Sequence, residues 1–219
     1  MVFLDFGHGG IDPVTRKYTT APAKMFDHKK SGHTFHNGTI IYEGVLNRDI
    51  GAMVAAKLRE MSVPFLHVAH PWMDTPLFSR VNFANKYAMK HPTEQHVYIS
   101  IHNNASGNGI QPGKGRGTEV FTTKGQTNSD KWATTYMNNL GISLRAHGLF
   151  EEIPIRGDWS DGDIDKEANF QVIKGVRMPA FLVECLFFDN LEDAKLIIDP
   201  TIQSIFANAI IETIIDMYL

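Results

Sequence analysis

Apolar residues gather in short runs along the chain, and between these runs they recur at helical spacing. Most of the runs are too short to show alternation, which is typical of strands that are buried on both faces. The pattern predicts strands at 2–5, 63–68, 97–101, 118–122 and 179–183.

Helices are expected in most of the intervals between the strands. The clearest runs from 43 to 60, where apolar residues recur on one face. Others are expected from 74–76 onward, with Leu77 on the inner face, from 129 to about 147, at 193–194, and from 200 onward. Strands that alternate with helices predict an α/β fold with a mostly parallel, twisted sheet flanked by helices. No repeat or linker divides the sequence, so we expect a single catalytic domain over residues 1–219.

The long stretch from residue 11 to 42 shows no periodicity and is polar and rich in glycine, proline and lysine. Long loops of this kind within a domain are usually functional or mobile. We expect its part from residue 16 to 42 to form a mobile lid or rim at the edge of a cleft.

Composition narrows the possible functions. The formal net charge of −3 and the sequence pI near 6.3 argue against a nucleic-acid partner, because no basic excess is available to neutralise phosphates. No apolar run approaches the roughly 18 residues of a membrane span, so no membrane insertion is expected. A single cysteine, Cys185, rules out an internal disulfide bond.

Polar residues with useful chemistry follow three of the predicted strands. His8, His102 and Glu184 stand at the ends of three buried runs, and Glu43 opens the first predicted helix. The carboxyl ends of parallel strands meet at one edge of a sheet, so we expect these residues to converge there. The glycines around His8 are interpreted as clearing space for its side chain.

Two histidines and one carboxylate, with a fourth position left for water, form a typical catalytic zinc set. We therefore expect His8, Glu43 and His102 to bind Zn²⁺. Glu184 can then take a proton from water and pass it to a leaving amine. Taken singly, each histidine is more often a hydrogen-bonded loop residue, and Glu43 suits a helix N-terminus by charge alone. The joint pattern favours metal-assisted amide hydrolysis.

Short motifs in a fixed order carry a family resemblance over nearly the whole chain. They lie at 5–10, at Glu43 with Asn47, at 77–85, 100–104, 117–121 and 179–194. The sequence resembles the zinc-dependent N-acetylmuramoyl-L-alanine amidases of the amidase-3 type. The resemblance implies that His8, Glu43 and His102 hold zinc and that Glu184 is the catalytic acid/base. It also implies peptidoglycan as the substrate, cleaved between N-acetylmuramic acid and L-alanine.

Alternative functions are a zinc peptidase or carboxypeptidase with a similar site, and a wall-binding module without turnover. Glu184 argues against a pure binder, which has no need of a base beside a metal. The N-terminus has no signal-peptide pattern. We therefore expect a chain made in the cytoplasm that acts on the wall after release, as an endolysin does. A trimmed secreted amidase would give the same sequence.

Some positions depart from the family pattern. The gap between His8 and Glu43 is long and holds His28, His33 and His36. One of these could replace or join the ligands, although solvated histidines on a mobile loop are the expected case.

Two further departures and one strand residue also bear on the site. His70 stands where the family has an arginine after the second strand. The sequence Cys185-Leu186-Phe187 replaces the usual small residue and glycine after Glu184, which we expect to narrow the cleft without changing the chemistry. Glu119 either reaches the site or pairs with a lysine or arginine. Arg80 is expected to anchor a helix through a salt bridge.

Overall fold

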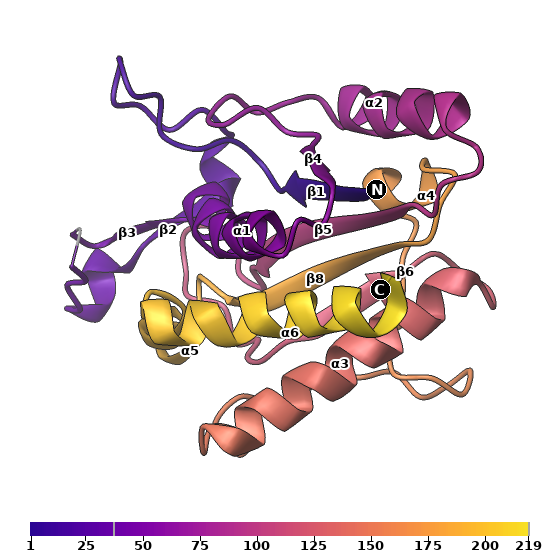
Figure 1. Cartoon of the computed structure of the whole chain (residues 1–219). Coiled ribbons are helices and arrows are strands. Elements are labelled where there is room, and N and C mark those ends of the chain that lie inside the picture. Colours follow the sequence, from indigo (N-terminus) through magenta and orange to yellow (C-terminus); the bar gives the residue numbers. More distant parts are fainter. Residues whose placement is uncertain (37, 219) are drawn as a thin grey trace.

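Strands within the described residues, 1–36 and 38–218, form a central sheet in the order β4-β1-β5-β8-β6-β7 (Figure 1). In this computed structural model the strands are β1 Val2–Phe6, β4 Phe65–His67, β5 Val97–Asn104, β6 Glu119–Thr122, β7 Lys166–Glu167 and β8 Ala180–Phe187. β4, β1, β5 and β8 run parallel, whereas β6 pairs antiparallel with β8 and carries β7 parallel to itself. The expected α/β fold with a mostly parallel sheet is confirmed.

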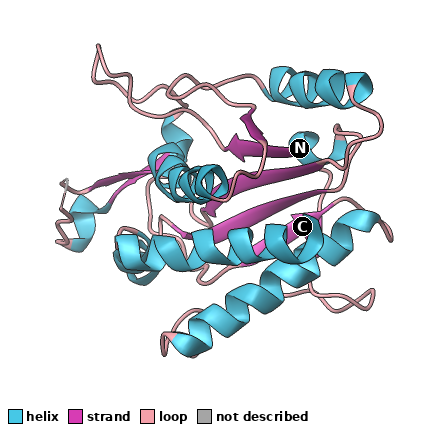
Figure 2. Ribbon diagram, viewed as in Figure 1, coloured by secondary structure: helices cyan, strands magenta, loops and turns pink. Residues whose placement is uncertain are grey.

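Helices cover both faces of the sheet (Figure 2). One face carries α1 Glu43–Glu60, α3 Asn128–Ala146 and α6 Pro200–Tyr218, and the other carries α2 Leu77–Lys90 and α4 Gln171–Lys174. The short α5 Leu191–Ile197 precedes α6. Within the described part, no helix is both long and apolar enough to cross a membrane.

The two-sided burial of the sheet explains its apolar strands. Val2 and Leu4 pack toward α1 and α6, while Phe3 between them packs toward α2 and α4, and all three are fully buried. A strand that is covered on both faces has no solvent-facing positions, so its sequence reads as a continuous apolar run.

Element boundaries differ from the expected ones where local signals are weak. The predicted strand 63–68 shortens to β4, and α2 begins at Leu77, whose side chain is 43% exposed instead of facing the core. The buried face of α2 consists of Arg80, Val81 and Ala84 and so begins one turn after Leu77. β8 continues past residue 183 to Phe187, so Glu184 lies within the strand and not after its end.

The stretch from 11 to 42 is more structured than its sequence suggests. β2 Met25–Asp27 and β3 Ile40–Tyr42 form an antiparallel hairpin that leads directly into α1. Phe26, His28 and Phe35 are buried and fasten the hairpin to the core. Mobility of the whole segment from 16 to 42 stays a prediction, and these anchors restrict it to the exposed residues between them.

Candidate metal centre and catalytic site

Three side chains converge at the carboxyl-terminal ends of β1 and β5. His8 follows β1, whereas β5 continues past residue 101 to Asn104, so His102 lies within that strand and not after its end. Nε2 of His8 lies 3.1 Å from Oε1 of Glu43, and Nδ1 of His102 lies 3.0 Å from the same oxygen. One potential ligand atom from each residue lies within 4.8 Å of the others. The register explains the meeting, because Phe6 pairs with Ile101 in parallel, so that both strands deliver a histidine at the same level.

Glu43 joins them because β3 runs straight into α1. Its carboxylate is the first acidic group of that helix and is only 1% exposed. Burial alone would raise the pKa of Glu43, but its contacts with His102 and His8 hold that pKa well below its usual range. Burial also lowers the pKa of His8, which keeps its imidazole neutral near pH 7.

These residues fit a metal ion of the size of zinc. Nε2 of His8 and Oε2 of Glu43 are buried, and neither has a hydrogen-bond partner among the described residues. Nε2 of His8 faces Oε1 of Glu43 without hydrogen-bond geometry. Tetrahedral zinc with bonds of roughly 2.0–2.2 Å spaces its ligand atoms by about 3.3 Å. The observed separations of 3.0 and 3.1 Å are close to that spacing.

The glycine before His8 has a different role from the one expected. A Cβ atom on Gly7 would lie 2.2 Å from Cε1 of His102, so the missing side chain makes room for the His102 ring and not for His8. A Cβ on Gly9 would meet the Thr19 hydroxyl at 2.1 Å, and His8 itself has a positive φ of 61°. The glycines therefore allow close packing around a strained loop.

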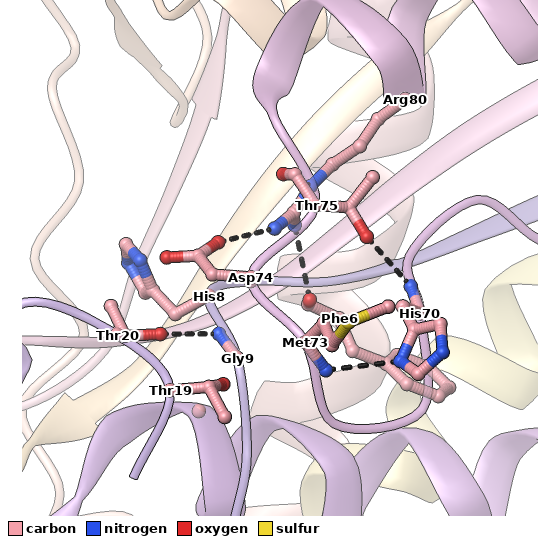
Figure 3. A network of polar contacts seen from close by, with 12 residues as sticks. Phe6, His8, Gly9, Thr19, Thr20, His70, Met73, Asp74, Thr75 and Arg80 are labelled. Atoms are coloured by element: carbon pink, nitrogen blue, oxygen red, sulfur yellow. Dashed lines mark hydrogen bonds and ion pairs between the residues drawn. The ribbon is translucent and has the colours of Figure 1, made fainter. Parts of the chain in front are cut away.

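Arg48 and Asn47 of α1 hold the loop that carries His8. Nη2 of Arg48 donates to the His8 carbonyl at 2.8 Å, and Nδ2 of Asn47 donates to the Gly7 carbonyl at 3.0 Å. On the other side of the loop, the Gly9 amide donates to Oγ1 of Thr20 at 2.6 Å (Figure 3). Asn47 thus ties the first helix, which starts at Glu43, to the end of β1.

A second polar network fixes the same loop from the side of α2 (Figure 3). Arg80 is buried and bonds Asp5 at 2.7 Å, Asp74 at 3.0 Å and the Phe6 carbonyl at 3.1 Å. This confirms the predicted salt bridge of Arg80. His70 accepts a hydrogen bond from the Met73 amide at 3.0 Å and closes a tight loop, which is a structural role.

Glu184 lies beside this cluster in the middle of β8. It pairs with His102 across β5 and with Glu119 across β6, so the three residues form a row over adjacent strands. Oε2 of Glu184 is buried without a hydrogen-bond partner in the described structure. Burial first, and then repulsion from Glu43, raise the pKa of Glu184 well above its usual range.

Comparison of the sequence with models of protein families assigns the chain to a family. The model of Amidase_3, described as N-acetylmuramoyl-L-alanine amidase, matches residues 2–216. The chain belongs to this family. It is accordingly an enzyme of the N-acetylmuramoyl-L-alanine amidase class, a hydrolase of the peptidoglycan cell wall.

Solved structures agree with the family assignment. An N-acetylmuramoyl-L-alanine amidase from Clostridium difficile 630 is 25% identical to this amidase, with a TM-score of 0.70 over 100% of this chain and 97% of that chain. The catalytic domain of CwlV from Bacillus (Paenibacillus) polymyxa var. colistinus is 21% identical, with a TM-score of 0.65 over 98% and 96%. The catalytic domain of the CD27L endolysin that targets Clostridia difficile is 17% identical, with a TM-score of 0.56 over 100% and 98%. Comparison with curated sequences finds no match.

The extra histidines of this amidase lie apart from the cluster. His28 is buried, and its Nε2 bonds the Phe188 carbonyl at 2.9 Å, so it is not the solvated side chain that we expected. His33 packs on Phe35, with ring centroids 4.6 Å apart. His36 is exposed and lines a separate recess of about 500 Å³. Among the described residues, only His8, Glu43 and His102 form a potential metal-ligand group.

Two of the three residues after Glu184, Cys185 and Leu186, do not narrow the amidase cleft as expected. Cys185 and Leu186 are completely buried within the core that packs against α1, α3 and α6. The alternation of side chains along β8 turns Cys185 away from the face that Glu184 occupies.

Three basic residues near the site carry no sequence signal that marks them out. Nζ of Lys24 lies 3.3 Å from Oε2 of Glu43, although Lys24 belongs to the stretch without periodicity. Arg156 and Lys166 both pair with Glu119, as the ion-pair alternative for that residue predicted. Each contact joins segments far apart in sequence, which no local motif reveals.

Proposed function

We propose that the chain hydrolyses the amide bond between N-acetylmuramic acid and L-alanine in peptidoglycan and that the reaction depends on Zn²⁺. His8, Glu43 and His102 would hold the ion, and Glu184 would act as the general acid/base. The convergence of the three ligand atoms next to Glu184 is the observation that carries this proposal.

The donor set favours zinc because it combines two neutral imidazoles with one carboxylate. Bound zinc would polarise the scissile carbonyl and make water a better nucleophile near neutral pH. The partly exposed Lys24 places a positive charge beside Oε2 of Glu43, on the oxygen that does not contact the two histidines.

Glu184 supplies the proton transfers. Its free buried oxygen accepts a proton from the attacking water and returns it to the amine nitrogen of L-alanine as the amide breaks. Burial raises the pKa of Glu184, whereas a cation held by the three ligands would lower it, and a balance between the two effects suits a group that takes up a proton and later returns it. Glu184 is not part of the potential ligand group, so its loss is expected to leave metal binding intact.

The first test is the metal content of the purified protein. We expect about one zinc per chain, and removal of the metal with a chelator should abolish wall hydrolysis until zinc is restored. His8→Ala and His102→Ala should lower zinc content. A protein that contains no zinc and takes up none on addition would contradict the proposal.

The second test separates metal binding from proton transfer. Glu184→Gln keeps the shape of the side chain but removes its acid/base function, which is typically worth about 10²–10⁴-fold in rate. Zinc content and release of L-alanyl peptides from peptidoglycan should be measured on the same preparation. Retained zinc with lost activity is expected; lost zinc would make Glu184 a ligand, and near-normal activity would end its role as the base.

A further inference from the structure

Two cationic side chains meet on Glu119, one strand away from Glu184. Glu119 and Glu184 are direct partners in the antiparallel register of β6 and β8, so their side chains leave the same face of the sheet. Nε of Arg156 and Nζ of Lys166 both bond Oε1 of Glu119, the latter at 2.7 Å. Nδ2 of Asn104 donates to Oε2 at 3.0 Å. The Glu119 carboxylate is therefore fully engaged by donors of the chain itself.

The two cations are only partly engaged. Arg156 bonds Glu119 through Nε, and neither of its terminal nitrogens has a hydrogen-bond partner in the part of the chain that the structure describes. Lys166 likewise has Glu119 as its acidic partner there. The side chains of Arg156 and Lys166 are 40% and 26% exposed, whereas that of Glu119 is 5% exposed. The group carries an excess positive charge, and its free donors face solvent.

This arrangement is held in place from several sides. The Arg156 guanidinium carbon lies 5.3 Å from the centroid of the Phe187 ring at the end of β8. Lys166 is delivered by β7, which pairs with β6 at Phe121. Donors that are fixed in this way lose little freedom when they bind an anion, which increases affinity.

We propose that Arg156 and Lys166 form a subsite for a carboxylate on the peptide side of the scissile amide, with Glu119 as their positioning residue. The proposal rests on the amide hydrolysis proposed above. The lactyl carboxyl of the muramic acid is consumed in the scissile amide, so free carboxylates lie on the peptide. The planar fork of a guanidinium matches a carboxylate with two parallel hydrogen bonds.

The distance between Glu184 and the two cations agrees with a subsite for a peptide carboxylate. Neighbouring strands are about 4.8 Å apart, so the cations on Glu119 lie roughly 7–10 Å from Glu184. An extended peptide advances about 3.3–3.6 Å per residue. The residue that follows the alanine therefore reaches the level of Arg156 and Lys166 when the amide is beside Glu184.

The test uses two synthetic N-acetylmuramoyl-L-alanyl peptides that differ only in whether the residue after alanine carries a carboxylate or a carboxamide. With the zinc-loaded wild-type protein, we expect kcat/KM for the carboxylate to be roughly 10–100-fold higher, mainly through KM. Arg156→Gln and Lys166→Gln should each move this ratio toward one by raising KM for the carboxylate peptide. Glu119→Gln should also move the carboxylate-to-carboxamide ratio of kcat/KM toward one, because it no longer holds Arg156 and Lys166 in place.

Lys57→Gln serves as the matched control, because Lys57 is an exposed lysine near the C-terminal end of α1, which packs on the opposite face of the sheet from Glu119 and Glu184. It should leave the ratio unchanged, and thermal unfolding should show that all variants are folded. A wild-type ratio near one would overturn the subsite, as would equal losses on both peptides, which indicate a purely structural role. Failure of the wild-type protein to cleave either peptide would instead overturn the proposed function and, with it, this inference.

Discussion

Substitution of Gly7 by alanine adds one carbon atom where β1 passes the His102 ring. That atom would lie 2.2 Å from Cε1 and 2.5 Å from each ring nitrogen of His102. Because real Cβ atoms essentially never come within 3.0 Å of such neighbours, the imidazole has to retreat by about 0.8 Å or more. Gly7 is not among the glycines with positive φ, so the backbone itself accepts alanine.

The expected effect is local to the site. His102, as a proposed ligand, loses its place opposite Glu43 when it moves by about 1 Å, and misplacement on this scale can cost about 10²-fold in rate. We expect a similar loss of zinc affinity, of about 10–100-fold. The free energy of unfolding should change much less, because His102 is partly exposed and can move outward.

The assay combines competition for zinc against a chelator with kcat/KM on peptidoglycan. Gly141→Ala is the matched control, since Gly141 is a buried glycine in α3 whose nearest neighbour is the flexible end of the Arg145 side chain at 3.3 Å. A helix interior favours alanine over glycine by up to about 1 kcal/mol, so this control should be neutral or stabilising. Wild-type zinc affinity and wild-type kcat/KM in Gly7→Ala would refute the assigned role of the glycine.

Two further predictions concern buried charges away from the ligands. Arg80→Met leaves Asp5 buried without its cation, so the free energy of unfolding measured in urea should fall by about 3–5 kcal/mol. Lys57→Met, the control, breaks an exposed ion pair and should change that free energy by less than about 1 kcal/mol. Equal changes in the two variants would contradict the role of the buried pair. Burial, opposed by a hydrogen bond and reinforced by two neighbouring carboxylates, raises the pKa of Asp165 to about 7. Between about pH 4 and pH 7, Asp165 is therefore protonated in the folded chain and ionised in the unfolded chain. The free energy of unfolding falls as pH rises through this range. In the wild-type protein the free energy of unfolding should fall by up to about 3 kcal/mol between about pH 5 and pH 8 because of Asp165, and Asp165→Asn should abolish this fall. The same pH dependence in both proteins would show that Asp165 titrates normally.

The parallel strands and the first helix could be predicted because each is marked by a clear hydrophobic pattern within a short stretch of sequence. Apolar residues from 43 to 60 recur at one helical period, and α1 has these same ends. The expected meeting of His8 with His102 followed from the rule that parallel strands end at one edge, and β1 and β5 are direct neighbours.

Other features depend on contacts that no short stretch of sequence encodes. β2 and β3 have three residues each, too few for a period of two to emerge from a polar background. The reversed direction of β6 is set by its pairing with β8, and the clearance at Gly7 depends on a ring that is 95 positions away in the chain. The ion pairs on Glu119 join three segments that only the folded sheet brings together.

The place of β8 in the sheet has a consequence for how the enzyme matures during synthesis. β1, α1 and β5, which carry the proposed ligands, are complete once residue 104 has been made, whereas β8 is the last strand to emerge and inserts between β5 and β6. A growing chain that folds from its N-terminus can thus bring the proposed ligands together before Glu184 has been made. The final strand to enter the sheet is also the one that carries the proposed base, so the proposed metal ligands can meet before the group proposed for proton transfer has been made, and a chain that ends before β8 would lack that group.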